Sequence, residues 1–245
     1  SPAGFDRTYT ALLAGLRGAT LAGLPELIEV DVIRLDFASN GSTGSIPAAP
    51  TALDWARSVD LQADDAAFDA DPIVVGGRTL DLAGEVDSIS GALALNIGGF
   101  VLAAGEFAFA QKLGQTIDDG EGVDAGPVPV LTGATLQTLH LSEVFLFVGA
   151  NGDFVRDTDG DVTGLDTADA VGFSVSGASL DLAVVTETTG DMRSWTGLAA
   201  QVGAMSVHGL PGEFELSVRS LSLLYNIADG SATPQKLDWN HLSLA

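Results

Sequence analysis

Three regularly spaced aspartates form the part of the chain whose residue types best suit metal binding. Asp157, Asp159 and Asp161 lie at positions i, i+2 and i+4 of the acidic segment NGDFVRDTDGDVTGLDTAD, and Asp166 follows them. Calcium prefers six to eight oxygen ligands, and a turn that directs alternate carboxylates inward supplies several of them. The spacing therefore predicts a calcium site in this loop.

The segment resembles the opening of an EF-hand or dockerin loop, D-x-D-x-D, but departs from it further on. Its sixth position holds Val162 in place of glycine, and its twelfth holds Ala168 in place of glutamate. Because the usual bidentate ligand is absent, we expect Asp153, Asp166 or Asp169 to substitute in a different geometry. The alternative is an acidic loop that is only exposed to solvent. The predicted metal ligands are Asp153, Asp157, Asp159, Asp161 and Asp166.

Catalytic chemistry has little support in the sequence. The chain has no cysteine, and its three histidines, at positions 140, 208 and 241, are widely separated, so thiolate chemistry is excluded and a zinc site is not expected. A G-x-S-x-G nucleophile elbow is absent. His208 lies on an alternating stretch, which favours a structural role. We therefore predict that the protein is not an enzyme.

The charge balance restricts the partners of the protein. Acidic residues outnumber basic ones by 33 to 10, and the formal net charge is −23. Nucleic acid binding and adhesion to an anionic membrane surface are therefore not expected, because both need a basic surface. No apolar run is long enough for a membrane-spanning helix, so we also expect no membrane insertion. The acid excess favours solubility, cation binding or a salty medium.

Two segments of the chain are similar in sequence at an offset of 186 residues. Residues 7–40 and 193–226 align without gaps with 11 identities in 34 positions, where chance gives roughly two or three. The similarity resumes in the sequence LDW, which occurs at 53–55 and again at 237–239. We interpret residues 1–62 as the C-terminal part of one repeat. Residues 63–245 form most of a following repeat that ends in a segment equivalent to 7–56.

The hydrophobic pattern has a period of two, which predicts strands. Residues 28–37 alternate with a one-residue slip at Ile33 that suits a β-bulge. Gly-Ala pairs recur at 18, 91, 133, 177 and 203, and we interpret each glycine as the end of a turn that leads into a strand. The predicted fold is all-β, a tandem repeat of mostly antiparallel hairpins stacked into an elongated body. A β-sandwich is the alternative.

Four Gly- and Val-rich stretches carry a resemblance to a known class of protein. They are GALALNIGGFVLAAGEFAF (91–109), VFLFVGANG (144–152), AVGFSVSGASLDLAV (170–184) and SWTGL (194–198). These stretches resemble tandem repeats of giant bacterial surface or secreted proteins, which often also carry hemolysin-type (RTX) calcium-binding repeats. The RTX nonapeptide G-G-x-G-x-D is absent. The resemblance implies an extracellular or cell-surface location.

The expected function is that of a structural or adhesive repeat module in a large extracellular protein, with calcium neutralising the acidic loops. Its partners would then be neighbouring repeats, and surface glycans or proteins. One alternative is a carbohydrate- or protein-binding β-module with specificity in the acidic loops. Two others are an apolar β-groove that carries lipid and an enzyme that acts on polysaccharide. We expect Trp55, Trp195 and Trp239 to pack in the core and not to form a sugar-stacking platform.

Overall fold

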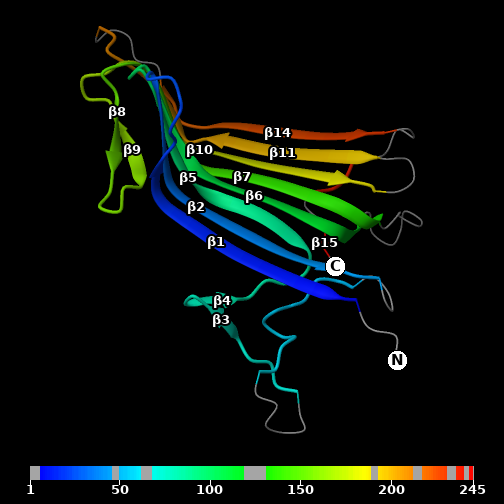
Figure 1. The fold of residues 1–245 in the computed structure, drawn as a ribbon. Coiled ribbons are helices and arrows are strands. Elements are labelled where there is room, and N and C mark those ends of the chain that lie inside the picture. The colour runs from blue at the N-terminus through cyan, green and yellow to red at the C-terminus, as the bar shows by residue number, and fades with distance from the viewer. Residues whose placement is uncertain are drawn as a thin grey trace, which may run out of the picture.

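The protein is built around one large antiparallel sheet, seen in a computed structural model (Figure 1). The structure describes residues 6–45, 50–61, 68–118, 131–188, 193–211, 217–230, 236–239 and 243–244. Eight long strands follow one another across the sheet in the order β1-β2-β5-β6-β7-β10-β11-β14. Their bounds are β1 Thr8–Thr20, β2 Ile28–Thr43, β5 Val86–Ile97, β6 Val101–Asp118, β7 Leu131–Ala150, β10 Val171–Thr186, β11 Ser194–Val202 and β14 Leu221–Asp229.

The remaining strands are short. β12 pairs with β10 and β13, and β15 pairs with β6. Two separate hairpins, β3–β4 and β8–β9, lie outside the large sheet. The bounds of these strands are β3 Ile73–Val75, β4 Arg78–Leu80, β8 Asp153–Arg156, β9 Val162–Asp166, β12 Ala204–His208, β13 Ser217–Val218 and β15 Ser243–Leu244.

The predicted all-β class is confirmed, since all the regular elements in the described ranges are strands. The described residues contain no helical segment with the length and hydropathy of a membrane span. Residues 8–16 of the N-terminal stretch RTYTALLAGL form part of β1.

The longer strands, such as β1 and β2, bend part-way along their length, so the sheet has a concave and a convex side (Figure 1). Both small hairpins lie on the convex side of the bend (Figure 1). We call the convex side the outer face and the concave side the inner face. Because successive side chains in a strand point to opposite faces, the pairing register assigns each residue to one of them.

A line of irregular positions crosses the sheet at the bend. β2 has the predicted bulge at Ile33, between the pairs Val32–Leu93 and Arg34–Ala92. β7 is interrupted near Glu143, which has φ of 49°, and β10 is interrupted near Gly177, which has φ of 62°. An extra residue in a strand bends it and increases its twist. The bend therefore follows from irregularities that lie side by side in neighbouring strands.

The Gly-Ala pairs have a different role from the one predicted. Gly18 and Gly177 do not end turns but lie inside strands at the bend, with positive φ. Gly91 also lies within a strand, where an added Cβ would be 2.3 Å from the carbonyl oxygen of Arg34 in the neighbouring strand. The glycines are thus required by backbone conformation or by close backbone approach at the bend.

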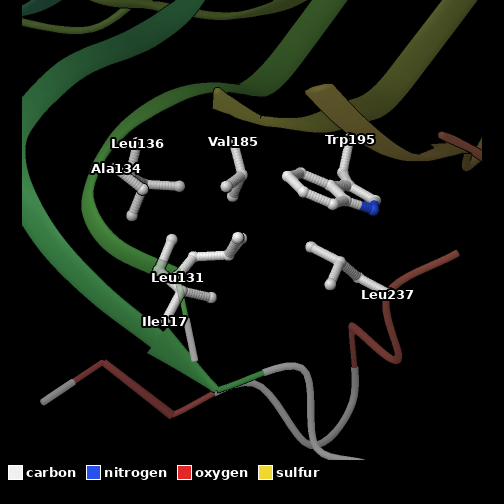
Figure 2. Close-up of a cluster of buried hydrophobic side chains, with 7 residues drawn as sticks. All are labelled: Ile117, Leu131, Ala134, Leu136, Val185, Trp195 and Leu237. Carbon is white, nitrogen blue, oxygen red and sulfur yellow. The ribbon is translucent and has the colours of Figure 1, made fainter. Parts of the chain in front are cut away.

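Two hydrophobic cores lie on the outer face. The larger one gathers residues of β6, β7, β10 and β11 beneath the C-terminal segment, which contributes Leu237 (Figure 2). Val185 and Trp195 point from the sheet toward Leu131, Ile117 and Leu237 (Figure 2). The smaller core contains Leu102, Phe147 and Ala170 and is covered by Phe154 and Leu165 of the β8–β9 hairpin. Both cores therefore join the sheet to segments that cover its outer face.

The two similar sequence segments form hairpins with the same register. Tyr9 of β1 lies opposite Ser42 of β2, and Trp195 of β11 lies opposite Ala228 of β14. Adding 186 to both residue numbers of the first pair gives the second pair. Met205 and Val218 of β12 and β13 continue the second pairing. The end of each hairpin also matches. An added Cβ on Gly44 or on Gly230 would lie 2.9 Å from the Cα of Arg7 or Arg193, respectively.

An asparagine, buried in the first hairpin and half-buried in the second, organises the same contact in both hairpins. The Nδ2 of Asn40 donates to the carbonyl oxygens of Leu53 and Gly84, and its Oδ1 accepts from the indole of Trp55 at 2.8 Å. Asn226 repeats this arrangement with Leu237 and Trp239. The recurring LDW sequence is thus fixed against the sheet by an Asn–Trp hydrogen bond. As predicted, Trp195 packs in a core, and Trp239 packs against the same core.

Replacing Gly91 with alanine tests the close backbone approach at the bend. The new Cβ cannot fit against the Arg34 carbonyl, so we expect Gly91→Ala to lower the free energy of unfolding by about 1–3 kcal/mol. Gly41→Ala in β2 is the control, because an added Cβ there meets nothing within 4 Å. Chemical denaturation of both variants measures the difference, and equal stability of the two would contradict this account.

Removing the asparagine side chain tests the repeated contact. Asn40→Ala leaves the Trp55 indole and the Leu53 and Gly84 carbonyls without their partner, and we expect a loss of roughly 2–4 kcal/mol in unfolding free energy. Among the described residues, Asn226→Ala removes two such hydrogen bonds and Asn40→Ala three, so the change at Asn226 should cost less. Denaturant titration of both variants measures the order, and a larger loss for Asn226→Ala would contradict the assignment.

Candidate functional site

The inner face of the sheet is apolar on all eight long strands. Its side chains come from alternate positions of each strand, and the register aligns them into continuous rows. One such row joins Phe37, Ile89, Phe109, Leu139, Leu182, Leu198 and Tyr225. In β6 the apolar positions run from Val101 to Phe109, which is roughly 26 Å of strand at about 3.3 Å per residue.

The inner face is open to solvent. The segments that cover the sheet in the described part of the chain all lie against its outer face: residues 53–61, residues 68–84, the β8–β9 hairpin and residues 237–239. Large inner-face side chains on the edge strands are exposed: Leu12 is 50% exposed, Leu223 57% and Tyr225 51%. Those on the central strands, such as Phe37, Phe109 and Leu182, are half-buried. Soluble monomers rarely expose apolar patches above a few hundred Å², and larger ones usually mark a binding surface.

Polar side chains border the apolar surface at one end. Ser39 donates to Asp87 at 2.6 Å, and Gln137 donates to Gln111 at 2.8 Å. These four residues occupy one row across β2, β5, β6 and β7 on the inner face. The inner face therefore combines an apolar area with a hydrogen-bonding margin.

A second hollow lies on the outer face beside the LDW segment of the second hairpin. This groove has a volume of about 580 Å³ and lies between strands β7, β10, β11 and β14 and Trp239. Its position corresponds to occupied space in the first hairpin. There, residues 78–84 lie against β1 and β2, with Arg78 3.6 Å from Asp36 and Leu82 accepting a hydrogen bond from the backbone of Trp55. The groove is thus the place where a segment like 78–84 would pack.

Two histidine pairs lie on the outer face. His140 Nδ1 is 2.5 Å from Asp181 at the edge of the groove, and both side chains are at least half exposed. His208 Nε2 is 2.7 Å from the hydroxyl of Ser174, across the β10–β12 pair. The second pair has the atoms of a nucleophile and a base, but neither residue lines the groove. His208 otherwise fits the structural role expected from its alternating stretch.

The acidic side chain with a clear pKa shift lies beside the larger core. Arg193 holds Glu187 by two hydrogen bonds of 2.9 and 3.0 Å, and these lower the pKa of the Glu187 carboxyl below its usual value despite partial burial. Arg193 also lies over the ring of Trp195, 5.4 Å from its centroid. This ion pair joins the residue that follows β10 to the residue that precedes β11 with charge-assisted hydrogen bonds.

The structure divides the predicted calcium ligands into two groups. Asp153 and Asp166 are opposite each other at the base of the β8–β9 hairpin. Asp157, Asp159 and Asp161 occupy the turn at its other end. Across the part of the chain that is described, no three acidic, histidine or cysteine side chains are placed to hold a metal ion.

The turn aspartates also have other roles. The Oδ1 of Asp157 accepts hydrogen bonds at 3.0 Å from the backbone N–H groups of Asp159 and Asp161. Asp161 points its own Oδ1 into the interior, where it has no hydrogen-bond partner among the described atoms. It borders a small hollow of about 280 Å³ together with Glu106 and Glu143. Since Arg34 pairs with Glu106, a cation already lies beside this cluster.

The sequence offered an apolar β-groove as one alternative but did not identify which residues form it. Its signal is present in the sequence, because Leu, Val and Phe fill alternate positions of nearly every strand while Ala, Ser, Gly and charged residues fill the others. That alternation predicted strands but not which face would be covered. Among the described residues, the identity of the covered face depends on segments 53–61, 68–84 and 151–169, which have no strong pattern of their own.

No protein family, curated protein or solved structure matches this chain.

Calcium binding at the β8–β9 hairpin stays a prediction with a direct test. We expect calcium to raise the thermal midpoint and EDTA to reverse the rise, because ligand binding stabilises the folded state. Asp157→Asn with Asp159→Asn removes carboxylates from the turn, and Asp153→Asn with Asp166→Asn removes them from the base. The double variant in which calcium no longer raises the thermal midpoint identifies the end of the hairpin that binds calcium. A midpoint insensitive to both calcium and EDTA would remove the metal prediction.

Proposed function

We propose that this chain is a repeat module of a large extracellular protein and that its inner face carries lipid or a ligand of similar apolar chemistry. The observation that carries the proposal is the open inner face, which is apolar across eight strands. Burial of apolar surface is favourable by about 25 cal/mol per Å², so an uncovered face of this kind gains most from an apolar partner.

The distribution of polar groups supports an apolar ligand over a carbohydrate. The ion pairs Arg34–Glu106 and Arg156–Asp31 lie on the outer face, as does the His140–Asp181 pair. In the described part of the chain, the polar side chains that hydrogen-bond to each other on the inner face lie along its margin, where Ser39, Asp87, Gln111 and Gln137 form a row. Such a margin suits a ligand with an apolar body and a polar end.

The matching hairpins support the modular part of the proposal. β1–β2 and β11–β14 share their register, their Asn–Trp contact and their terminal glycine, which two unrelated hairpins would not share. The extracellular location is proposed from the resemblance to repeats of giant bacterial surface proteins. Calcium is proposed to neutralise the acidic β8–β9 turn in that setting.

A purely mechanical role is the second candidate function, in which the module acts as a spacer or adhesive body. The matching hairpins favour it as much as they favour the lipid-carrying role. The two roles differ in what covers the inner face. A spacer buries this face against protein, whereas a lipid-carrying module leaves it accessible to small apolar molecules.

The lipid-carrying role is tested by ligand binding. We expect the purified protein to retain lipid that organic extraction and mass spectrometry detect, and to bind a fluorescent fatty acid in solution. Phe107→Ser with Phe109→Ser removes two large apolar side chains from the inner face of β6, and we expect at least a tenfold weaker affinity for the probe.

The adjacent outer-face positions give a matched control. Ala108→Ser with Ala110→Ser adds the same hydroxyl groups to the same strand but on the opposite face, and we expect unchanged affinity. Equal affinity in both double variants would contradict the lipid-carrying role, as would absence of lipid and of probe binding in the unaltered protein. The spacer role would then be the better proposal.

A further inference from the structure

One edge of the sheet is formed by β14, and the similar strand β2 shows what such a strand pairs with. β2 has β1 on one side and β5 on the other, whereas β14 has β11 on one side. Because β11 corresponds to β1 in register, the second side of β14 corresponds to the side of β2 that binds β5. In the described portion of the protein, no strand occupies that side.

The unpaired side of β14 is apolar and exposed. Leu221, Leu223 and Tyr225 are each more than half exposed, and Leu224 is 81% exposed. The strand carries no charged residue before Asp229. Proteins normally protect an edge strand with charges, proline or a covering loop. The corresponding residues Leu35, Phe37 and Ala38 of β2 are only partly exposed, because β5 lies beside them.

Asn226 gives a second indication of a missing neighbour. Asn40 uses its two amide hydrogens for the carbonyl oxygens of Leu53 and Gly84, and Gly84 comes just before β5. Asn226 donates to the carbonyl oxygen of Leu237, which corresponds to Leu53. The acceptor that corresponds to Gly84 would arrive with a β5-like strand.

From these correspondences we infer that the free edge of β14 binds, in antiparallel register, a strand with the sequence character of β5, supplied by a further copy of the 186-residue unit. The inference rests on the modular part of the proposed function and not on lipid binding. The register follows by adding 186 to the β2–β5 pairing. Leu223 then lies opposite the equivalent of Ile89, and Asn226 opposite the equivalent of Val86.

This pairing specifies how units join. A unit contributes six long strands, β1, β2, β5, β6, β7 and β10, before the pattern restarts at β11. At about 4.8 Å between strands, each unit widens one continuous sheet by roughly 29 Å. The units therefore extend the sheet sideways, and the apolar inner face runs through every junction. The groove beside Trp239 is filled in the same step by a segment like 78–84.

A peptide of residues 84–98 tests the edge directly. We expect it to bind the protein and to slow hydrogen exchange at alternate backbone amides of β14, and not at β1. The matched control peptide carries Gly91→Val, because the Gly91 position approaches the neighbouring backbone too closely for a side chain. Equal binding of both peptides, or protection at β1 as strong as at β14, would overturn the inference.

An extended chain covers the case in which a short peptide binds too weakly. Gly230 corresponds to Gly44, so residues 1–230 followed directly by residues 45–188 restore a second unit. We expect a single cooperative unfolding transition and strong exchange protection of β14. Two independent transitions with β14 still unprotected would overturn the inference. Fatty-acid binding is measured on the same samples, so loss of the lipid-carrying role and loss of the edge pairing give different results.

Discussion

The structure depends on keeping apolar side chains on one face of strands that bend. A one-residue insertion moves every later side chain to the opposite face of a strand. In β2 the inner face is filled by Val30 and Val32 before Ile33 and by Leu35 and Phe37 after it, so the change of parity is absorbed by the bulge. β7 and β10 change parity near Glu143 and Gly177 in the same way. β5 and β6 continue through the bend without a bulge.

The sequence predicted the local structure well and the arrangement of the layers poorly. Alternation identified the strands, and the slip at Ile33 located the bulge, because both depend on side chains near in sequence. The Gly-Ala pairs were interpreted as turn ends, since sequence alone does not show that Arg34 approaches Gly91 across a strand pair. The offset of 186 residues led to two hairpins whose register agrees residue by residue.

The candidate site was harder to predict from the sequence, because it depends on which face of the sheet the covering segments leave open. The metal site was predicted from the spacing of acidic residues in the sequence. In the structure, Asp153 and Asp157 lie at opposite ends of a hairpin. The apolar inner face has no motif, and its residues look like ordinary core positions in the sequence. In the described ranges, the placement of segments 53–61, 68–84 and 151–169 on the outer face distinguishes the inner face from a core.

The two long edges of the sheet are different surfaces, and this difference gives the molecule a direction. β1 and β14 cannot substitute for each other. β1 corresponds to β11, which pairs with β10, whereas β14 corresponds to β2, which pairs with β5. Association through unlike surfaces is heterologous, and it produces an open filament unless the rotation between units closes a ring. A polymer of this kind has distinguishable ends, so its growth can be stopped at either end by a single capping unit.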